Sequence, residues 1–449
     1  MAIIAPFKGI TYNWQLFKEP SHLLAPPYDV ISEEEQDYYY LLHPHNIIRL
    51  ILGKKRIGDS DWDNRYTRAA DHFKRWLEEG VLVRAKEPCL YLTSVRFKAD
   101  EGGPTFERWG VIGLVRIEEP DSSVIMPHEK TFSAHKEDRL KLMRACNAQF
   151  SQIFGLYEDG DKSIKQIIDH YSKTEHLLHF TFRDNTEHKF YVIKDPSIIS
   201  TIYNSFLSKK ILIADGHHRY ETARIFRNIM RTKYDPKPSN RSYEYTMMYL
   251  ADMLGEGLVI LPTHRLVRTA PLTEPAQILN GLKDYFHVRV FKDNDLGYLL
   301  KELKASGRST PSFLARFRGL RDTYLLSLQP TGWDAIGDDL DPSLKVLDVM
   351  VLSRLFFQKV LGFKKEHMDR EEIFHYTSDP LQAFEATEKG EYLISVLMNP
   401  TKIEQVRDVA QKGLVMPRKS TFFYPKVLSG LVLNKIDPYE IVYVPESER

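Results

Sequence analysis

Several side chains that could act on a phosphate follow one short apolar run. The run Ile211–Ala214 is followed directly by Asp215, Gly216, His217, His218 and Arg219. A glycine at such a point lets the backbone approach a ligand, and the first N–H groups of a helix bind phosphate. Arginine clamps phosphate with two bonds, histidine moves protons, and aspartate acts as a base or holds magnesium. The pattern favours a phosphate-handling turn over an ordinary Asp-Gly turn.

Four further polar clusters supply candidate substrate-binding residues. They contain Asp29 in a proline-rich loop, His128 and Glu129 before Arg139, His264 and Arg265 after an apolar strand, and Lys419 and Lys426 in a basic loop. Each cluster also has a plain structural interpretation, as a rigid turn, a solvated loop, an exposed strand end or a basic loop. The sequence alone leaves both interpretations open for each cluster.

Common catalytic templates are absent from the chain. It contains no G-x-x-x-x-G-K-[ST], G-x-G-x-x-G, H-E-x-x-H or G-x-S-x-G pattern. Their absence argues against ordinary P-loop kinases, Rossmann dehydrogenases, zincins and serine hydrolases.

Composition narrows the class of protein further. The 449 residues suggest about three domains, or two large ones. Lys and Arg number 62 and Asp and Glu 61, for a net charge of +1, which argues against a nucleic-acid or membrane-surface binder. Two cysteines cannot build a disulfide framework. With no secretory leader and no long apolar run, we expect a cytoplasmic protein without membrane spans.

The elements that must position these residues follow from local patterns. Ser32 with Glu35 is a capping box that predicts a helix ending before Pro44. A second helix is predicted over 64–79, and two strand patterns within 81–118 predict a hairpin. A further helix is expected to end near residue 148.

The candidate turn joins a predicted strand at 210–214 to a predicted helix at 217–231. Tyr220, Ala223, Phe226 and Met230 recur on one face of that helix. After residue 269 strands and helices alternate again. There, Asp341-Pro342 predicts the start of a long helix that ends at Gly362. We therefore expect an α+β protein with an N-terminal region, 1–270, and a C-terminal α+β domain, 271–449.

The chain resembles the bacterial and archaeal family catalogued as domain of unknown function 1015. The resemblance covers about residues 5–435 and rests on strings that occur in this order: APPYDVIS, HPHNIIRL, PHEKT, DRLKLMRA, ADGHHRYETA, LPTHRLV and MPRKSTFFYPK. Its specificity comes from the agreement of many separate strings.

The turn itself is similar to one in the ParB/sulfiredoxin superfamily. Sulfiredoxins carry Gly-Cys-His-Arg-Tyr there, so His217 replaces the repair cysteine and sulfinic-acid repair is not expected. Free serine kinases carry Asp-Gly-His-His-Arg, the closer match. The resemblance implies a mixed α/β core with a β-rich insertion, and phosphate binding by Gly216, His218 and Arg219. Thr222, one turn into the helix, is a further candidate.

The resemblance implies a nucleotide-dependent phosphotransferase acting on a small hydroxyl metabolite, L-serine or O-phosphoserine, in either direction. ATP or ADP and Mg²⁺ are the expected cofactors. Asp215 would take the hydroxyl proton or position the metal, and His217 and His218 would stabilise the transferred group. Arg139, Arg265, Lys419 and Lys426 are candidates for the substrate carboxylate or a distal phosphate. Alternatives are a nucleotide-binding regulator and a metal-assisted phosphatase using His128, Glu129, His217 and His218; a homodimer is left open.

Overall fold

The computed structural model describes residues 1–100, 102–235, 239–292, 295–368 and 370–445. They form two compact units. Unit 1 contains Met1–Pro127, Thr131–Val259 and the chain from Pro425 onward, and unit 2 contains His128–Lys130 and Ile260–Tyr424. The predicted division at residue 270 did not anticipate this return of the chain to unit 1.

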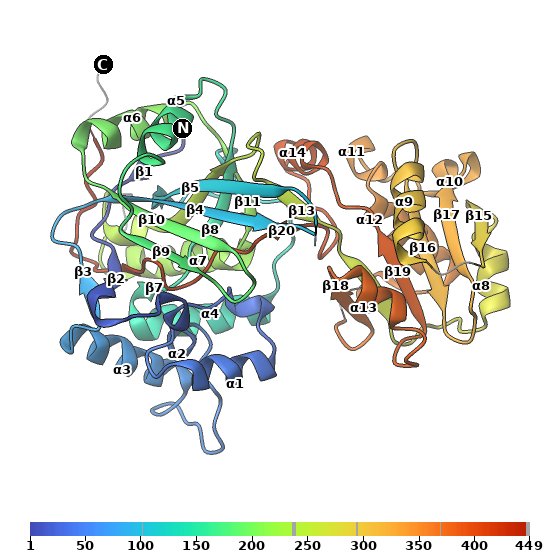
Figure 1. Cartoon of the computed structure of the whole chain (residues 1–449), viewed down its shortest axis with the longest axis horizontal. Coiled ribbons are helices and arrows are strands. Elements are labelled where there is room, and N and C mark those ends of the chain that lie inside the picture. Colours follow the sequence, from blue (N-terminus) through green and yellow to red (C-terminus); the bar gives the residue numbers. More distant parts are fainter. Residues whose placement is uncertain (101, 236–238, 293–294, 369, 446–449) are drawn as a thin grey trace. The chain divides into compact units, whose positions relative to one another are not determined.

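A mixed nine-stranded sheet runs through the described part of unit 1 (Figure 1). Its order is β6-β11-β8-β12-β5-β4-β10-β9, with β1 paired to β5. The strands are β1 (Ile4–Ala5), β4 (Leu90–Lys98), β5 (Thr105–Arg116), β6 (Ile125–Met126), β8 (Ile153–Tyr157), β9 (Leu178–Thr181), β10 (Glu187–Ile193), β11 (Ile211–Asp215) and β12 (Tyr245–Asp252). Parallel pairs β6–β11 and β8–β12 lie within otherwise antiparallel pairings. The β4–β5 pair confirms the predicted hairpin.

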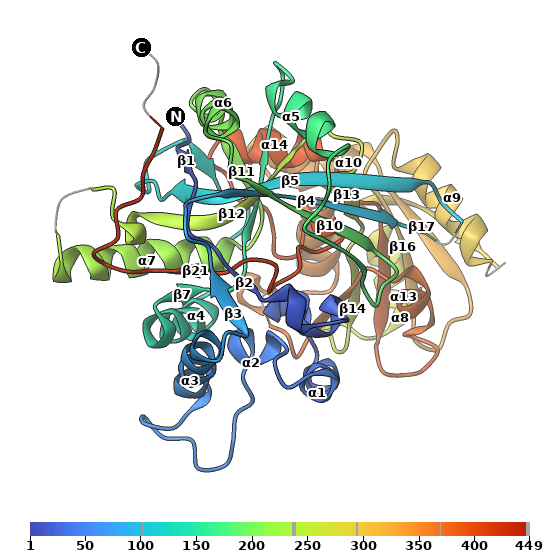
Figure 2. The same cartoon turned by 60° about the vertical axis from the view of Figure 1, so that its left-hand side comes forward.

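Helices cover both faces of this sheet. They are α1 (Glu33–Leu42), α2 (Ile48–Ile51), α3 (Arg65–Glu78), α4 (Ser133–Cys146), α5 (Ser163–Tyr171), α6 (Pro196–Phe206) and α7 (His217–Lys233). Figure 2 shows α5 and α6 on one side of the sheet and α7, α4 and α3 on the other. Short pairs join β2 (Ile10–Tyr12) to β3 (Leu82–Arg84) and β7 (Ala148–Gln149) to β21 (Asn434–Lys435). Short 3₁₀ turns are η1 (Trp14–Leu16), η2 (Pro20–Leu23), η3 (Tyr28–Val30) and η4 (Ser242–Glu244).

The predicted apolar stripe of α7 is buried in the core of unit 1. Tyr220, Ala223, Phe226 and Met230 pack in one cluster with the sheet residue Ile153. Burial of a large apolar side chain stabilises a fold by about 1.5–3 kcal/mol. This packing fixes α7 against the sheet and thereby places its first turn at the end of β11.

Gly110 of β5 makes room for a buried tyrosine of the next strand. A β-carbon at Gly110 would lie 2.1 Å from Cε2 of Tyr249. We expect Gly110→Ala to lower the free energy of unfolding by about 1–3 kcal/mol, because the ring must shift within a packed core. Chemical denaturation measures this, with Gly160→Ala as the control because no atom lies within 4 Å of its added carbon. Equal losses in the two variants would contradict the packing argument.

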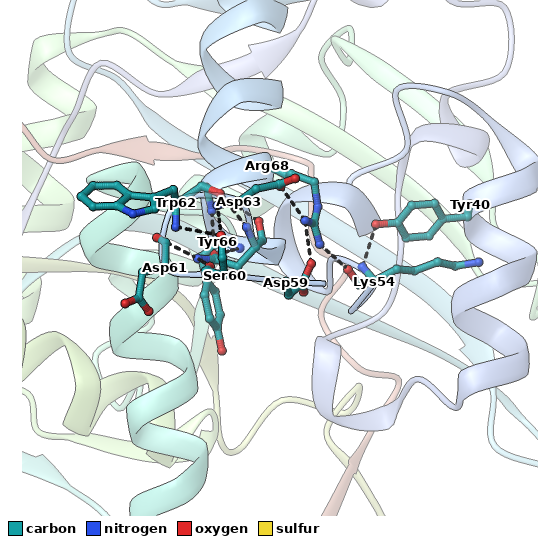
Figure 3. Close-up of polar contacts among 11 residues, drawn as sticks. Tyr40, Lys54, Asp59, Ser60, Asp61, Trp62, Asp63, Tyr66 and Arg68 are labelled. Carbon is teal, nitrogen blue, oxygen red and sulfur yellow. Dashed lines mark hydrogen bonds and ion pairs between the residues drawn. The ribbon is translucent and has the colours of Figure 1, made fainter. Parts of the chain in front are cut away.

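A polar network fixes the start of α3 (Figure 3). One guanidinium nitrogen of Arg68 donates to Asp59 at 2.8 Å and to Asp63 at 2.7 Å. Asn64 caps the helix by accepting from the backbone N–H of Tyr66 at 2.9 Å. The helix predicted over 64–79 is confirmed, and its first turn is held in place to contact α4.

Unit 2 is built on a six-stranded antiparallel sheet within its described residues. The order is β15-β17-β16-β19-β14-β18. The strands are β14 (His264–Val267), β15 (Phe286–Phe291), β16 (Ser312–Phe317), β17 (Thr323–Leu328), β18 (Phe374–Thr377) and β19 (Ile394–Met398). The α-helices are α8 (Pro275–Leu282), α9 (Leu296–Ser306), α10 (Pro330–Ala335), α11 (Pro342–Lys345), α12 (Asp348–Val351), α13 (Pro380–Glu385) and α14 (Ile403–Gln411), and η6 (Lys365–His367) is a 3₁₀ turn. Two short strands, β13 (Val259–Leu261) and β20 (Phe422–Tyr424), form a separate pair. Both units thus mix helices and strands, as the predicted α+β class requires.

The single helix predicted from Asp341-Pro342 to Gly362 was wrong in its middle. α11 begins as predicted, with Asp341 as its cap, but it ends at Lys345. Leu347 is extended, with φ −82° and ψ 125°, and its side chain is buried. The helix restarts at α12 and continues as the π-helix η5 (Leu352–Val360) before Gly362, at φ +76°. Periodicity therefore missed a break where a buried leucine turns into the core.

In the described part of the chain, no helix has the length and apolar character needed to span a membrane.

Candidate functional site

The predicted strand-to-helix turn is present at the end of β11. Gly216 caps α7 with φ +91°, a left-handed conformation that favours glycine. Its carbonyl accepts the first helical hydrogen bond, from the N–H of Tyr220 at 3.0 Å. A β-carbon at Gly216 would lie 2.9 Å from Nε of Arg219. The glycine therefore provides both the turn and the space for this guanidinium.

The Asp215 carboxylate lies between two cations. Oδ1 accepts from Nζ of Lys426 at 2.5 Å, and Oδ2 accepts from Nη2 of Arg219 at 2.6 Å. Burial favours a higher pKa for Asp215, but the positive charges of Lys426 and Arg219 outweigh it and hold that pKa far below its usual range. Asp215 is therefore ionised at neutral pH, with both oxygens engaged.

Arg219 is held from two sides and keeps one donor available. Besides Asp215, its guanidinium donates to the backbone oxygen of Gln152. The side chain is about nine-tenths buried, and its Nε–H has no hydrogen-bond partner among the described residues. A buried donor left without a partner costs about 1–3 kcal/mol. An oxygen of a bound anion would satisfy it.

The two histidines of the turn are arranged differently. His217 is buried, and burial lowers its pKa to about 3, so it is uncharged at neutral pH. Nε2 of His218 accepts from the backbone N–H of Phe132 at 3.0 Å. Its ring also lies 5.0 Å from that of His135, centre to centre. Because Nε2 accepts a hydrogen bond, Nδ1 is the nitrogen that carries a proton.

A cavity of about 50 Å³ lies beside the first two turns of α7. It has room for a few water molecules. Arg139, Arg219 and Thr222 contribute to its wall, and none of the described lining residues is acidic. The lining residues are Ile51, Arg139, Leu142, Met143, Ala148, Gln149, Phe150, Ser151, Ile153, Arg219, Thr222 and Thr246. The cavity thus combines two guanidinium groups with largely apolar walls.

Neighbouring side chains fix Arg139 in this wall. Its Nε donates to Asp138 at 2.7 Å and its Nη1 to the carbonyl of Ile51 at 2.6 Å. The guanidinium lies 3.9 Å from the centre of the Tyr28 ring. Asp138 in turn accepts from the hydroxyl of Tyr66 at 2.6 Å. The predicted candidate next to Tyr28, Asp29, is exposed.

Other predicted candidates gather in unit 2. Nε2 of His128 lies 3.1 Å from Oγ1 of Thr421. Glu129 accepts from the backbone N–H of Lys419 at 3.5 Å, and Nη2 of Arg265 donates to the carbonyl of Lys419 at 3.0 Å. Burial lowers the pKa of Arg265 to about 10, so it stays charged at neutral pH.

His264 precedes Arg265 on β14 and is fully buried. Its Nδ1 accepts from the backbone N–H of Met398 at 3.0 Å, and burial lowers its pKa to about 4. This residue is therefore a neutral histidine bound to the sheet backbone.

The predicted site residues thus divide into two groups. Unit 1 brings together Asp215, Gly216, His217, His218, Arg219, Thr222, Arg139 and Lys426. Unit 2 holds His128, Glu129, His264, Arg265 and Lys419. Sequence reasoning missed Tyr28, Gln152 and Arg108 as neighbours of the first group. Arg108 offered one signal, since it is a charged residue that leads into the apolar strand pattern of β5.

Comparisons with known proteins place the chain in context. A family model described as "Protein of unknown function (DUF1015)" matches residues 4–350. No curated protein matches the chain. A structure of a free serine kinase in complex with AMP is similar at 12% identity over 67% of this chain and 83% of that one, with a TM-score of 0.32.

Two further solved structures are similar at the same level. A conserved hypothetical protein from Pyrococcus furiosus shows 13% identity over 68% of this chain and 89% of that one, with a TM-score of 0.33. SbnI with a C-terminal truncation, from Staphylococcus aureus, shows 8% identity over 71% and 85%, with a TM-score of 0.33. At TM-scores below 0.5, these likenesses carry no weight for the function of this chain.

Proposed function

The chain belongs to the DUF1015 family, and we propose that it is a nucleotide-dependent phosphotransferase acting on a small hydroxyl metabolite, L-serine or O-phosphoserine. The observation that carries the proposal is the Asp215 carboxylate held between Arg219 and Lys426 at the N-terminus of α7. It joins a carboxylate, two cations and a helix N-terminus at one point. The same combination serves phosphoryl transfer by positioning and charge stabilisation.

The phosphates of the nucleotide would bind at the first turn of α7. Its leading N–H groups have no partners within the helix, and the helix dipole favours negative charge there. The Nε–H of Arg219 offers a further donor beside Gly216. The adjoining cavity brings a second guanidinium, that of Arg139, to the wall that Arg219 also lines.

The transfer step balances as follows. The acceptor hydroxyl oxygen forms a bond to the terminal phosphorus of the nucleotide, and the bond from that phosphorus to the bridging oxygen breaks. The bonding electron pair stays on the departing nucleotide, and the hydroxyl proton passes to the carboxylate of Asp215 and then to water. Because the transition state is loose, the proton leaves late and a weakly basic carboxylate suffices. With O-phosphoserine and ADP the same step runs in reverse.

A resident magnesium ion does not fit the residues of this site. Both oxygens of Asp215 are bound by cations. The described residues contain no group of three His, Cys, Asp or Glu side chains suited to a metal ion. Mg²⁺ therefore enters the proposal only as the counter-ion that accompanies the nucleotide. No group of metal ligands among the described residues supports a metal-assisted phosphatase.

Phosphorus NMR of the purified protein tests the proposal. Samples contain Mg²⁺ and either L-serine with ATP or ADP, or O-phosphoserine with ADP. We expect the phosphoserine signal to grow in the samples with L-serine or to decline in the sample with O-phosphoserine. The rate of this change should fall about 100-fold in His218→Ala. The control is His170→Ala, on the exposed face of α5. Loss of phosphoserine at the same rate without nucleotide would indicate a phosphatase, and no change in any sample would reject serine as the substrate.

A nucleotide-binding regulator is the second candidate. The observation in its favour is that Lys426 and Arg219 already engage both oxygens of Asp215. A carboxylate whose two oxygens are both engaged accepts a proton poorly, as expected of a site that binds phosphate through the two cations without transferring it. Nucleotide binding in calorimetry, with no turnover of any hydroxyl compound, would select this function.

A further inference from the structure

Three histidines gather in unit 1 where the turn between α1 and α2 packs on α3. His43 and His45 lie in that turn, on either side of a proline, and their rings are 5.5 Å apart, centre to centre. His72 lies on α3. The ring of the buried Trp76 lies 5.4 Å from that of His45 and 5.8 Å from that of His72. One buried tryptophan thus joins the turn to the helix.

Two of these histidines accept a hydrogen bond on Nδ1. The backbone N–H of His45 donates to Nδ1 of His43 at 3.0 Å, which closes the turn. A guanidinium nitrogen of Arg75 lies 2.8 Å from Nδ1 of His72. Because arginine can only donate, this Nδ1 is the acceptor. In both rings the neutral form therefore carries its proton on Nε2, and a second proton must go to Nδ1. Protonation thus breaks the hydrogen bond in each case.

The third histidine is held at its backbone and not at its ring. The carbonyl of His45 accepts from the hydroxyl of Tyr12 at 2.7 Å. Its Nδ1 is buried and has no hydrogen-bond partner among the described residues. A charged ring at this position would have no hydrogen bond at that nitrogen to compensate its burial.

The charges around the three rings are mainly positive. Burial lowers the pKa of all three histidines, and the positive charge of Arg49 lowers it further in each. The other groups that face the rings include two carboxylates, which favour protonation. The full set is Tyr12 of β2, His22 of η2, Arg49 of α2, Arg56 before α3, Asp71 and Arg75 of α3, and Glu79 at its end. Three arginines outnumber two acids, so a proton added to a ring meets like charge.

The segment that contains the turn also supports a wall of the larger cavity. Residues 43–51 end at Ile51, which lines that cavity and whose carbonyl accepts from Nη1 of Arg139 at 2.6 Å. The other support of Arg139 is Asp138, which accepts from the hydroxyl of Tyr66 on α3 at 2.6 Å. That second support does not involve the turn. Movement of residues 43–51 therefore removes the first support and leaves α3 and α4 joined.

We propose that the three histidines form a pH-sensitive switch: in mild acid their protonation opens residues 43–51 away from Trp76 and takes the Ile51 carbonyl from Arg139. In the open form the rings are solvated and bind protons below about pH 6.5, the usual value for histidine. The closed form binds them less readily, so opening becomes more favourable as the pH falls below that value. Above it the closed form is retained.

Amide hydrogen exchange of the full chain, followed by mass spectrometry, tests the switch without nucleotide or serine. After correction for the intrinsic effect of pH on exchange, we expect the opening of residues 43–51 to increase at least about tenfold from pH 7.5 to pH 5.5. Peptides from β4 in the sheet should stay protected at both values. The same opening of residues 43–51 at both pH values would overturn the proposal, as would an equal increase in β4.

Asparagine at positions 43 and 72 removes the protonation but keeps the acceptor. Its side-chain oxygen is attached to Cγ, as Nδ1 is, and it commonly accepts from the backbone N–H two residues on. In the double variant His43→Asn, His72→Asn we expect the closed form at pH 7.5 to be kept. The increase in opening at pH 5.5 should be at least about threefold smaller than in the parent.

The matched control is His170→Asn, on the exposed face of α5, which should keep the full pH dependence. An unchanged pH dependence in the folded double variant would overturn the role of these rings. Should the double variant not fold, exchange of the unmodified protein at the two pH values still decides. The switch does not depend on the proposed function, because its test measures only the opening of unit 1.

Discussion

Replacing Asp215 with asparagine should lower the rate of phosphoryl transfer by about 100-fold or more, while nucleotide binding is retained. The substitution keeps the size of the side chain but removes the charge that holds Arg219 and Lys426 in place. Two buried cations then lose their shared counter-charge and repel one another. A phosphate still meets both cations, so its affinity should not fall. Rates from phosphorus NMR and affinities from calorimetry separate the two effects.

The same substitution should destabilise unit 1. Removal of one partner from a buried ion pair costs about 3–5 kcal/mol, because the remaining charge stays buried without compensation. The control is Asp169→Asn, which breaks an exposed pair with Lys165 at 3.2 Å and should change neither activity nor stability measurably. Turnover at the normal rate in Asp215→Asn would refute the role of this carboxylate in the transfer.

Mild acid should destabilise unit 1 through two buried histidines. Burial lowers the pKa of both His188 and His217 to about 3, whereas an unfolded histidine has a pKa of about 6.5. Between these values the unfolded chain binds protons that the folded chain does not bind, so stability falls as the pH drops below about 6.5. At pH 5 the loss relative to pH 7.5 is about 2 kcal/mol for each histidine.

Chemical denaturation at pH 7.5 and pH 5 measures this loss. In His188→Gln the difference between the two pH values should shrink by about 2 kcal/mol, because only one of the two buried histidines still titrates. His170→Gln, on the exposed face of α5, should leave the difference unchanged. The low pKa of Asp215 places its titration below this range. Burial raises the pKa of Asp348, in unit 2, to about 7, but this group titrates alike in the parent protein and in both variants, so the comparison between them is unaffected. An unchanged difference in His188→Gln would contradict the mechanism.

Local features of the fold could be predicted because neighbouring residues determine them. The capping box of Ser32 and Glu35 is present as predicted, and so is the strand-to-helix turn at Gly216. Both depend on backbone conformation and hydrogen bonds within a few residues. The break at Leu347 was missed because it depends on which side chains are buried in the core of unit 2. The periodicity of one segment contains no information about that packing.

The candidate site was predictable only in part, for the same reason. The turn residues from Asp215 to Arg219 are contiguous, so their chemistry could be recognised in the sequence. Lys426 was one of several basic candidates, and nothing local distinguished it from Lys419, which the structure places in unit 2. Arg108 was missed as a neighbour of this site because its contacts are with Tyr249 and Pro425, which are distant in the chain.

The return of the chain to unit 1 has a consequence for biosynthesis. Asp215 and Lys426 are separated by 211 positions, and the whole of Ile260–Tyr424 is made between them. Because chains emerge from the ribosome N-terminus first, α7 and all nine strands of the sheet are synthesised well before Lys426. A nascent chain thus carries Asp215 and Arg219 without their ammonium partner. The contact between Asp215 and Lys426 can therefore form only at a late stage of translation.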